Sequence, residues 1–185
     1  MSRSMRLTGV LAAALSAMVV MPVTADEDAD TVRTRLSGYN ETPLTINSTG
    51  SGEFEARIRN DETTIEYTLT YRDTSSTVLQ SHIHFGRPAI SGGVVLFLCT
   101  NLTPPTGVPK PPACPAAPAT VTGTLTAADV IAVPGQGIDP GAAGFAEMLM
   151  AIQASAAYVN VHTTSHPSGE IRGRLGGHRR HAHSN

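Results

Sequence analysis

The chain has 185 residues, of which 41% are hydrophobic and 15% charged, and its 13 Lys and Arg nearly balance its 15 Asp and Glu. This composition excludes a chain that is disordered throughout, and without a basic excess it argues against nucleic acid as a partner. The 17 glycines, 13 prolines, 4% aromatic residues and absence of Trp indicate short segments and many turns around an aliphatic core. An all-β fold is therefore favoured over a helical one.

The first 25 residues have the order of a secretory signal peptide. Arg3 and Arg6 precede an apolar run over 7–20, and small residues stand before a cleavage position after Ala25. An uncleaved anchor is the alternative, but the run is shorter than the roughly 20 residues that span a bilayer. No later segment of the sequence has the length and apolarity of a membrane span. We therefore expect a secreted or periplasmic protein with an acidic leader over 26–30.

Eight segments with alternating polar and apolar residues, or with short apolar runs, follow in the expected β-domain, 31–176. They cover 32–39, 53–59, 64–71, 81–85, 94–99, 120–125, 157–163 and 170–175. Period-two alternation is typical of strands with one face on a core, so we predict an antiparallel Greek-key β-sandwich or barrel of about eight strands.

Two helical segments lie between the predicted strands, and a tail follows the last one. Thr126 is the expected N-cap of a short turn, with Asp129 as a charge in its capping region. Residues 142–154 carry apolar residues at helical spacing, which predicts a short crossover helix packed on the sheet edge; a cofactor-binding stripe is the alternative. After a loop over 135–144 and the last strand, the basic tail 177–185, with its three histidines, is expected to be disordered and to bind metal only loosely.

Cys99 and Cys114 lie on either side of a proline-rich stretch. In an exported protein, an even number of cysteines at short spacing indicates a disulfide. Two buried free thiols are the alternative, and metal binding by this pair alone is a weaker one.

Three histidines on predicted strands form a candidate metal site. His82 and His84 are two residues apart, so they share one face of their strand while Ile83 takes the other. On the strand over 157–163, Val159 and Val161 take the core face, and Asn160 and His162 take the opposite one. Three imidazoles suit copper or zinc, and we expect the rings to meet beneath the loop from Cys99 to Cys114 or the loop after Gly135. Hydrogen bonding of these histidines to a neighbouring loop without a metal is the alternative.

Arg172 is expected on the same side as His162, because it alternates with apolar residues of the last strand. A cation there would either steer a small anion toward the site or pair with Glu170, which is otherwise expected to be a surface charge.

Four sequence blocks together resemble the chordin (CHRD) domain. They are SHIHFG at 81–86, GTLTAAD at 123–129, AYVNVHT at 157–163 and PSGEIRG at 167–173. The resemblance covers nearly all of 31–175 and implies an extracytoplasmic β-domain, that is, a secreted or periplasmic binding module without established catalysis whose partner is a protein or small ligand.

A second, partial resemblance is to the copper-binding half of Cu/Zn superoxide dismutase. It implies that His82, His84 and His162 bind copper and that Arg172 lies near the metal, whereas the metal-bridging and zinc-site histidines are missing between His84 and His162. The alternative function is therefore a copper-dependent oxidoreductase of superoxide dismutase type.

Overall fold

The computed structural model describes residues 29–59, 61–104 and 106–176. The predicted signal peptide and C-terminal tail lie outside these residues. The first strand begins at Ala29, within the segment expected to be an acidic leader.

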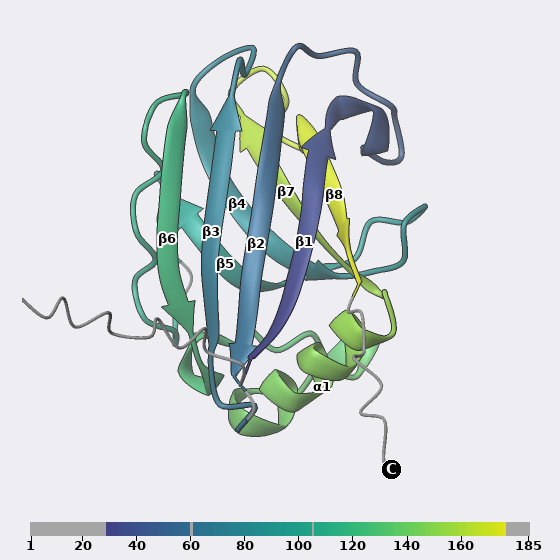
Figure 1. The fold of residues 1–185 in the computed structure, drawn as a ribbon, viewed down its shortest axis with the longest axis vertical. Helices are drawn as coiled ribbons and strands as arrows, with labels where there is room; N and C mark the ends of the chain where they lie inside the picture. Colours follow the sequence, from purple (N-terminus) through teal and green to yellow (C-terminus); the bar gives the residue numbers. More distant parts are fainter. Residues whose placement is uncertain (1–28, 60, 105, 177–185) are drawn as a thin grey trace, which may run out of the picture.

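The described residues hold eight strands, which form one sheet, as the sequence predicts. They are β1 (Ala29–Ser37), β2 (Ser51–Arg59), β3 (Ile65–Arg72), β4 (Val78–Phe85), β5 (Gly93–Thr100), β6 (Ala119–Leu125), β7 (Ala157–Thr163) and β8 (Ile171–Leu175). Their order in the sheet is β5-β4-β7-β8-β1-β2-β3-β6, and each neighbouring pair is antiparallel. The sheet curls into a nearly closed barrel in which β5 and β6, at the two ends of this order, contact each other (Figure 1).

The inside of the barrel is filled by the apolar members of the alternating strands. In β3, for example, Ile65, Tyr67, Leu69 and Tyr71 are buried, and the residues between them are largely exposed. Burial of such aliphatic and aromatic side chains contributes roughly 1.5–3 kcal/mol each. The core therefore fixes which face of every strand points inward and which points outward.

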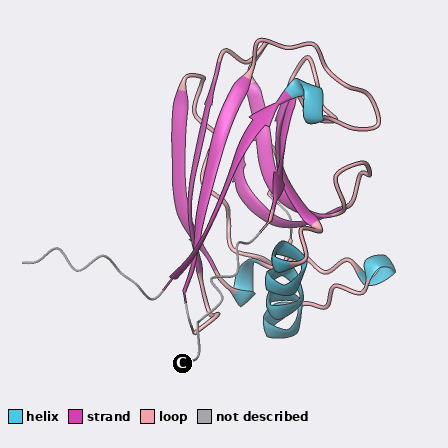
Figure 2. Ribbon diagram, turned by 45° about the vertical axis from the view of Figure 1, so that its right-hand side comes forward, coloured by secondary structure: helices cyan, strands magenta, loops and turns pink. Residues whose placement is uncertain are grey.

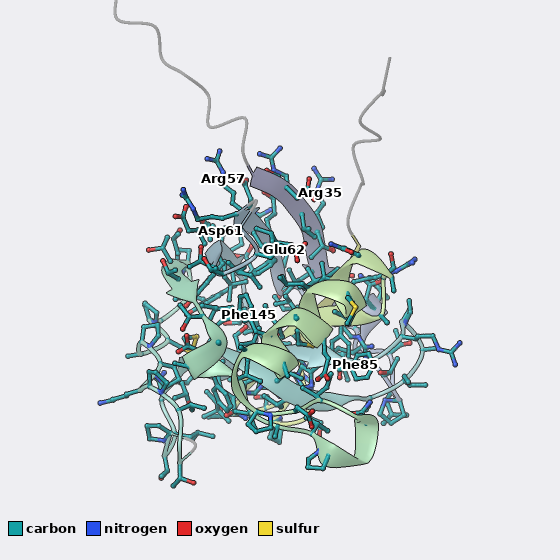
Figure 3. All side chains as sticks on the ribbon, turned by 90° about the horizontal axis from the view of Figure 1, so that it is seen from below. Arg35, Arg57, Asp61, Glu62, Phe85 and Phe145 are labelled. Atoms are coloured by element: carbon teal, nitrogen blue, oxygen red, sulfur yellow. A yellow bond between two sulfur atoms is a disulfide. The ribbon has the colours of Figure 1, made fainter. Side chains whose placement is uncertain are left out.

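One helix lies across an end of the barrel (Figures 2 and 3). The helix α1 (Gly141–Gln153) buries Phe145, Met148, Leu149 and Ile152, which confirms the predicted crossover helix. The loop expected over 135–144 is shorter, because α1 begins at Gly141 and the 3-10 helix η3 (Pro134–Gln136) precedes it.

The predicted cap near Thr126 is also present. In the 3-10 helix η2 (Ala127–Asp129), the Asp129 carboxylate accepts hydrogen bonds from the backbone and side chain of Thr126 at 2.8 and 3.0 Å. Such a reciprocal cap stabilises the start of a helical turn.

Cys99 and Cys114 form a disulfide, as predicted. It joins the end of β5 to the segment that leads to β6, and Asn101 adds hydrogen bonds from its side chain to the carbonyl oxygens of Val78 and Cys114. The proline-rich stretch is therefore tied to the barrel at both ends.

Strand β7 differs from β3 because every one of its residues is buried. Its inner face packs on the core, so its outer face must be covered by other segments. The candidate site lies on that covered outer face.

Candidate metal centre

The structure brings the three predicted histidines together. His82 and His84 lie on β4, His162 lies on the neighbouring strand β7, and one ligand atom from each falls within 4.8 Å of the others. The closest pair is His82 Nδ1 and His162 Nε2, at 3.2 Å. The convergence inferred from strand alternation is confirmed.

All three imidazoles are buried, although they lie opposite the core face. Their exposed fractions are 2% for His82, 6% for His84 and 6% for His162. The rings therefore lie on the outer face expected from strand alternation, and loops cover this part of the barrel's outer surface.

The covering contacts come from loops other than those predicted. His84 Nδ1 donates to the carbonyl oxygen of Gly92 at 3.0 Å, and His162 Nδ1 donates to that of Pro167 at 2.9 Å. The covering loops are thus 86–92 and 164–169. Because a carbonyl oxygen only accepts, both Nδ1 atoms carry the proton and both Nε2 atoms present a lone pair.

Asn160 lies among these lone pairs. Its Oδ1 is 3.0 Å from His84 Nε2 and 2.9 Å from His162 Nε2. The remaining ring nitrogen of the cluster, His82 Nε2, is buried and has no hydrogen-bond partner among the described residues.

Burial keeps the cluster uncharged. It lowers the pKa of His82 to about 2 and that of His84 to about 4, and it also lowers the pKa of His162. Neighbouring histidines add to the effect at His82, since two imidazolium charges would repel each other. At neutral pH the three rings are therefore neutral, which is the form that binds metals.

Tyr158 and Arg172 support His84 from the side. The Tyr158 ring is stacked on the His84 ring with centroids 4.5 Å apart, and the Arg172 guanidinium lies 3.4 Å from the Tyr158 centroid. The Tyr158 hydroxyl accepts from the backbone N–H of Gly92 at 3.1 Å. Tyr158 thus contacts both His84 and the loop residue that orients it.

Arg172 lies on the side of the sheet predicted for it, but it is only 2% exposed. Its guanidinium donates to the Thr42 hydroxyl and to the carbonyl oxygens of Arg87 and Ile90, at 3.1 and 2.8 Å for the two carbonyls. These partners hold Arg172 against loop 86–92. Steering of an anion by Arg172 stays a prediction.

Glu170 is not the surface charge expected from the sequence. It is fully buried, and its carboxylate accepts hydrogen bonds from Ser48, Ser75 and Thr163 at 2.5–2.9 Å. Burial alone would raise the pKa of Glu170, but these bonds favour the charged form and lower it overall. Pairing with Arg172 is also wrong, because Thr163 at the end of β7 and the distant residues Ser48 and Ser75 supply the partners of Glu170.

Glu41 was not singled out by the sequence. Its side chain is 5% exposed, and its Oε1 has no hydrogen-bond partner in the described part of the chain. Burial raises the pKa of Glu41 to about 7, and the positive charge of Arg172 opposes this rise. Glu41 and Arg172 line the same cleft, next to loop 86–92. A single Glu in a loop carries no periodic signal that would have found it.

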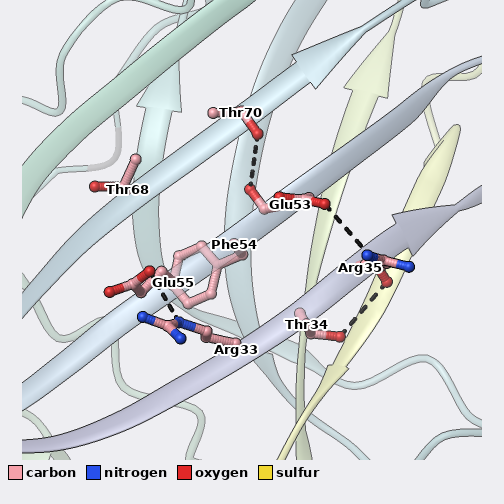
Figure 4. Close-up of a pocket in the computed structure, with 8 residues that line it drawn as sticks. All are labelled: Arg33, Thr34, Arg35, Glu53, Phe54, Glu55, Thr68 and Thr70. Atoms are coloured by element: carbon pink, nitrogen blue, oxygen red, sulfur yellow. Dashed lines mark hydrogen bonds and ion pairs between the residues drawn. The ribbon is translucent and has the colours of Figure 1, made fainter.

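A separate hollow lies on the outer face of β1, β2 and β3 (Figure 4). Its charged side chains form cross-strand ion pairs, Arg33 with Glu55 and Arg35 with Glu53, at 3.0 and 3.5 Å. These side chains are largely solvated and already paired, so the hollow is a less promising binding site than the histidine cluster.

A family model for the CHRD domain matches residues 32–175. The chain belongs to the CHRD family. No curated protein and no solved structure matches it. The CHRD domain is an extracellular or periplasmic domain that supports a role as a binding module, and the disulfide fits such a compartment. Within the described residues, none of the helices has the length and apolarity needed to cross a membrane.

Proposed function

We propose that this CHRD domain is an exported binding module that holds a transition-metal ion at His82, His84 and His162. Copper is the first candidate. The observation that carries the proposal is the convergence of three neutral imidazoles in a buried site. The hydrogen bonds from two Nδ1 atoms to backbone carbonyls are the outer contacts that commonly fix the orientation of metal-ligating histidines.

One pair of donor atoms already has the spacing of two ligands on one ion, and the cluster as a whole, within 4.8 Å, would have to contract on binding. Two nitrogens that each lie about 2.0–2.1 Å from one metal ion can be up to about 4 Å apart. The 3.2 Å between His82 Nδ1 and His162 Nε2 satisfies this limit without movement. Coordination through His82 Nδ1 would leave the proton of this neutral ring on Nε2, which has no hydrogen-bond partner among the described residues.

Imidazole nitrogens suit copper and zinc, and bound copper would supply one-electron redox chemistry. A copper-dependent oxidoreductase of superoxide dismutase type is the second candidate. Three histidine donors favour it, since they leave room on the ion for a small exogenous ligand.

Metal retention tests the proposal. The protein, with the three tail histidines His178, His181 and His183 replaced by Ala, is loaded with Cu(II) or Zn(II), dialysed and analysed for metal content. We expect about one ion per chain, and loss of that ion in His84→Gln and His162→Gln. Gln is chosen over Ala because both rings are buried and a large cavity would destabilise the fold.

His166→Gln is the matched control. His166 lies in the turn next to His162 but outside the cluster, so its variant should retain the ion. Absence of stoichiometric metal in the unmodified cluster would overturn the proposal. Turnover of superoxide that depends on bound copper would favour the second candidate.

A further inference from the structure

Asn160 is placed at the centre of the site by both neighbouring strands. It pairs with His82 of β4 on one side and with Arg172 of β8 on the other, and it is 3% exposed. Because paired residues of antiparallel strands point to the same face, its side chain must share the covered outer face with the cluster.

The contacts of Asn160 Oδ1 are unusual for a hydrogen-bonding group. The oxygen lies 3.0 and 2.9 Å from His84 Nε2 and His162 Nε2. Both nitrogens present lone pairs, because their Nδ1 atoms donate to Gly92 and Pro167. Asn160 Oδ1 is itself an acceptor, so it faces each of these two lone pairs at about 3 Å with no hydrogen between the oxygen and either nitrogen. A cation shared by the three atoms resolves this conflict.

We propose, on the basis of the metal site above, that Asn160 Oδ1 is the fourth donor and makes the site selective for a divalent ion, cupric or zinc, over the cuprous ion. A carbonyl oxygen is a hard donor that suits divalent ions, whereas soft sulfur ligands select Cu(I). The donor set is then three imidazole nitrogens and one amide oxygen, all supplied by the adjacent strands β4 and β7.

In the competing arrangement, the side-chain amide of Asn160 is rotated by half a turn, so that its oxygen and nitrogen exchange places. Its Nδ2 would then donate to both Nε2 atoms and hold the histidines together without metal. The two arrangements differ in what removal of the amide does. Loss of a donor weakens metal binding, whereas loss of a hydrogen-bonding group destabilises the metal-free protein and leaves the metal affinity unchanged or stronger.

The experiment compares Asn160→Ala and Asn160→Asp in the background without tail histidines. Zn(II), Cu(II) and Cu(I) affinities are measured by competition with chromophoric chelators, and the Cu(II) form is examined by electron paramagnetic resonance. We expect Asn160→Ala to weaken Zn(II) and Cu(II) binding about tenfold or more, by analogy with the loss of other groups around metal sites. It should leave Cu(I) affinity unchanged and alter the Cu(II) spectrum.

Asn160→Asp keeps an oxygen donor and adds a negative charge, so it should bind the divalent ions at least as tightly as the wild type. It also keeps the proposal falsifiable if the Ala variant does not fold. Wild-type affinity for Cu(II) and Zn(II) in Asn160→Ala would overturn this proposal alone. Failure of the wild-type cluster to bind any of the three ions would overturn the metal site as well.

Discussion

The loops that orient His84 and His162 also bury the cluster, and this burial opposes protonation of its histidines. Loops 86–92 and 164–169 exclude water from rings that strand alternation places opposite the core. A neutral imidazole tolerates this environment when its N–H has a carbonyl partner, but an imidazolium does not. The metal-free domain should therefore be sensitive to acid.

We expect the metal-free protein to lose stability as the pH falls from about 7 toward 4. The folded-state pKa values of His82, His84 and His162 are lowered, to about 2 for His82 and about 4 for His84, so the unfolded chain takes up more protons below its ordinary histidine pKa of about 6.5. Each histidine then contributes a slope of about 1.4 kcal/mol per pH unit. Urea unfolding at pH 7.5, 6 and 5 measures the effect.

Glu41 acts in the opposite direction and provides the control. Its folded-state pKa is raised to about 7, so its contribution to stability is present at low pH and is lost as the pH rises through 7. Glu41→Gln should therefore steepen the loss of stability in acid. A free energy of unfolding that stays constant between pH 7.5 and 5 would contradict the assignment of the histidines as buried and neutral.

The sequence was sufficient to place His82, His84, Asn160 and His162 on one face, because the two-residue repeat of a strand leaves no other choice. It did not predict which loops bury them or the role of Glu170. Both depend on loops that cross the outer face, and their contacts join residues far apart in the chain without a periodic pattern.

At the scale of elements, loop 86–92 is the segment that links the cluster to β8. It provides the carbonyl of Gly92 to His84, and it accepts hydrogen bonds from Arg172 at Arg87 and Ile90. Arg172 also stacks on Tyr158, which contacts His84. We infer that Arg172 positions the cluster through this loop.

Arg172→Met should loosen loop 86–92 and weaken metal binding about tenfold. The substitution retains much of the apolar stem but removes the donors to the two loop carbonyls. Hydrogen exchange of the loop amides and competition for Zn(II) measure the two effects.

Arg174→Met is the matched control, since Arg174 is exposed on the same strand and lines the same cleft. Exchange rates in the loop that do not change in Arg172→Met would argue against the positioning role. If Arg172→Met changed only the salt dependence of copper-dependent superoxide turnover, the result would instead favour the predicted anion steering.

Strands and the helix were predictable because their patterns are local. The alternation in β3 and the helical spacing in α1 follow from which side of each element meets the core. The covering loops were assigned incorrectly, since proximity to the cysteines or to Gly135 says nothing about which turn folds over β7. That choice depends on the sheet order, in which β4 and β7 are neighbours although distant in sequence.

For the whole molecule, the disulfide reinforces the place where the barrel closes. Cys99 is the residue before the last of β5, and Cys114 lies in the segment that returns to β6, the strand at the other end of the sheet order. The bond therefore restricts the connection between the two ends of the sheet. The three cluster histidines lie on β4 and β7 and take their loop contacts elsewhere.

Replacement of both cysteines by Ala should lower the free energy of unfolding by about 3 kcal/mol, the value expected when a closed loop of this length is released in the unfolded chain. The fold should persist, because Asn101 still donates from its side chain to Val78 and to residue 114 through backbone carbonyls. Urea unfolding of the double variant and of the reduced wild type measures the loss and separates the cross-link from the change in side chain. Metal affinity should remain that of the wild type. If the double variant kept its stability but lost the ion, the disulfide would stabilise the metal site and not the closure of the barrel.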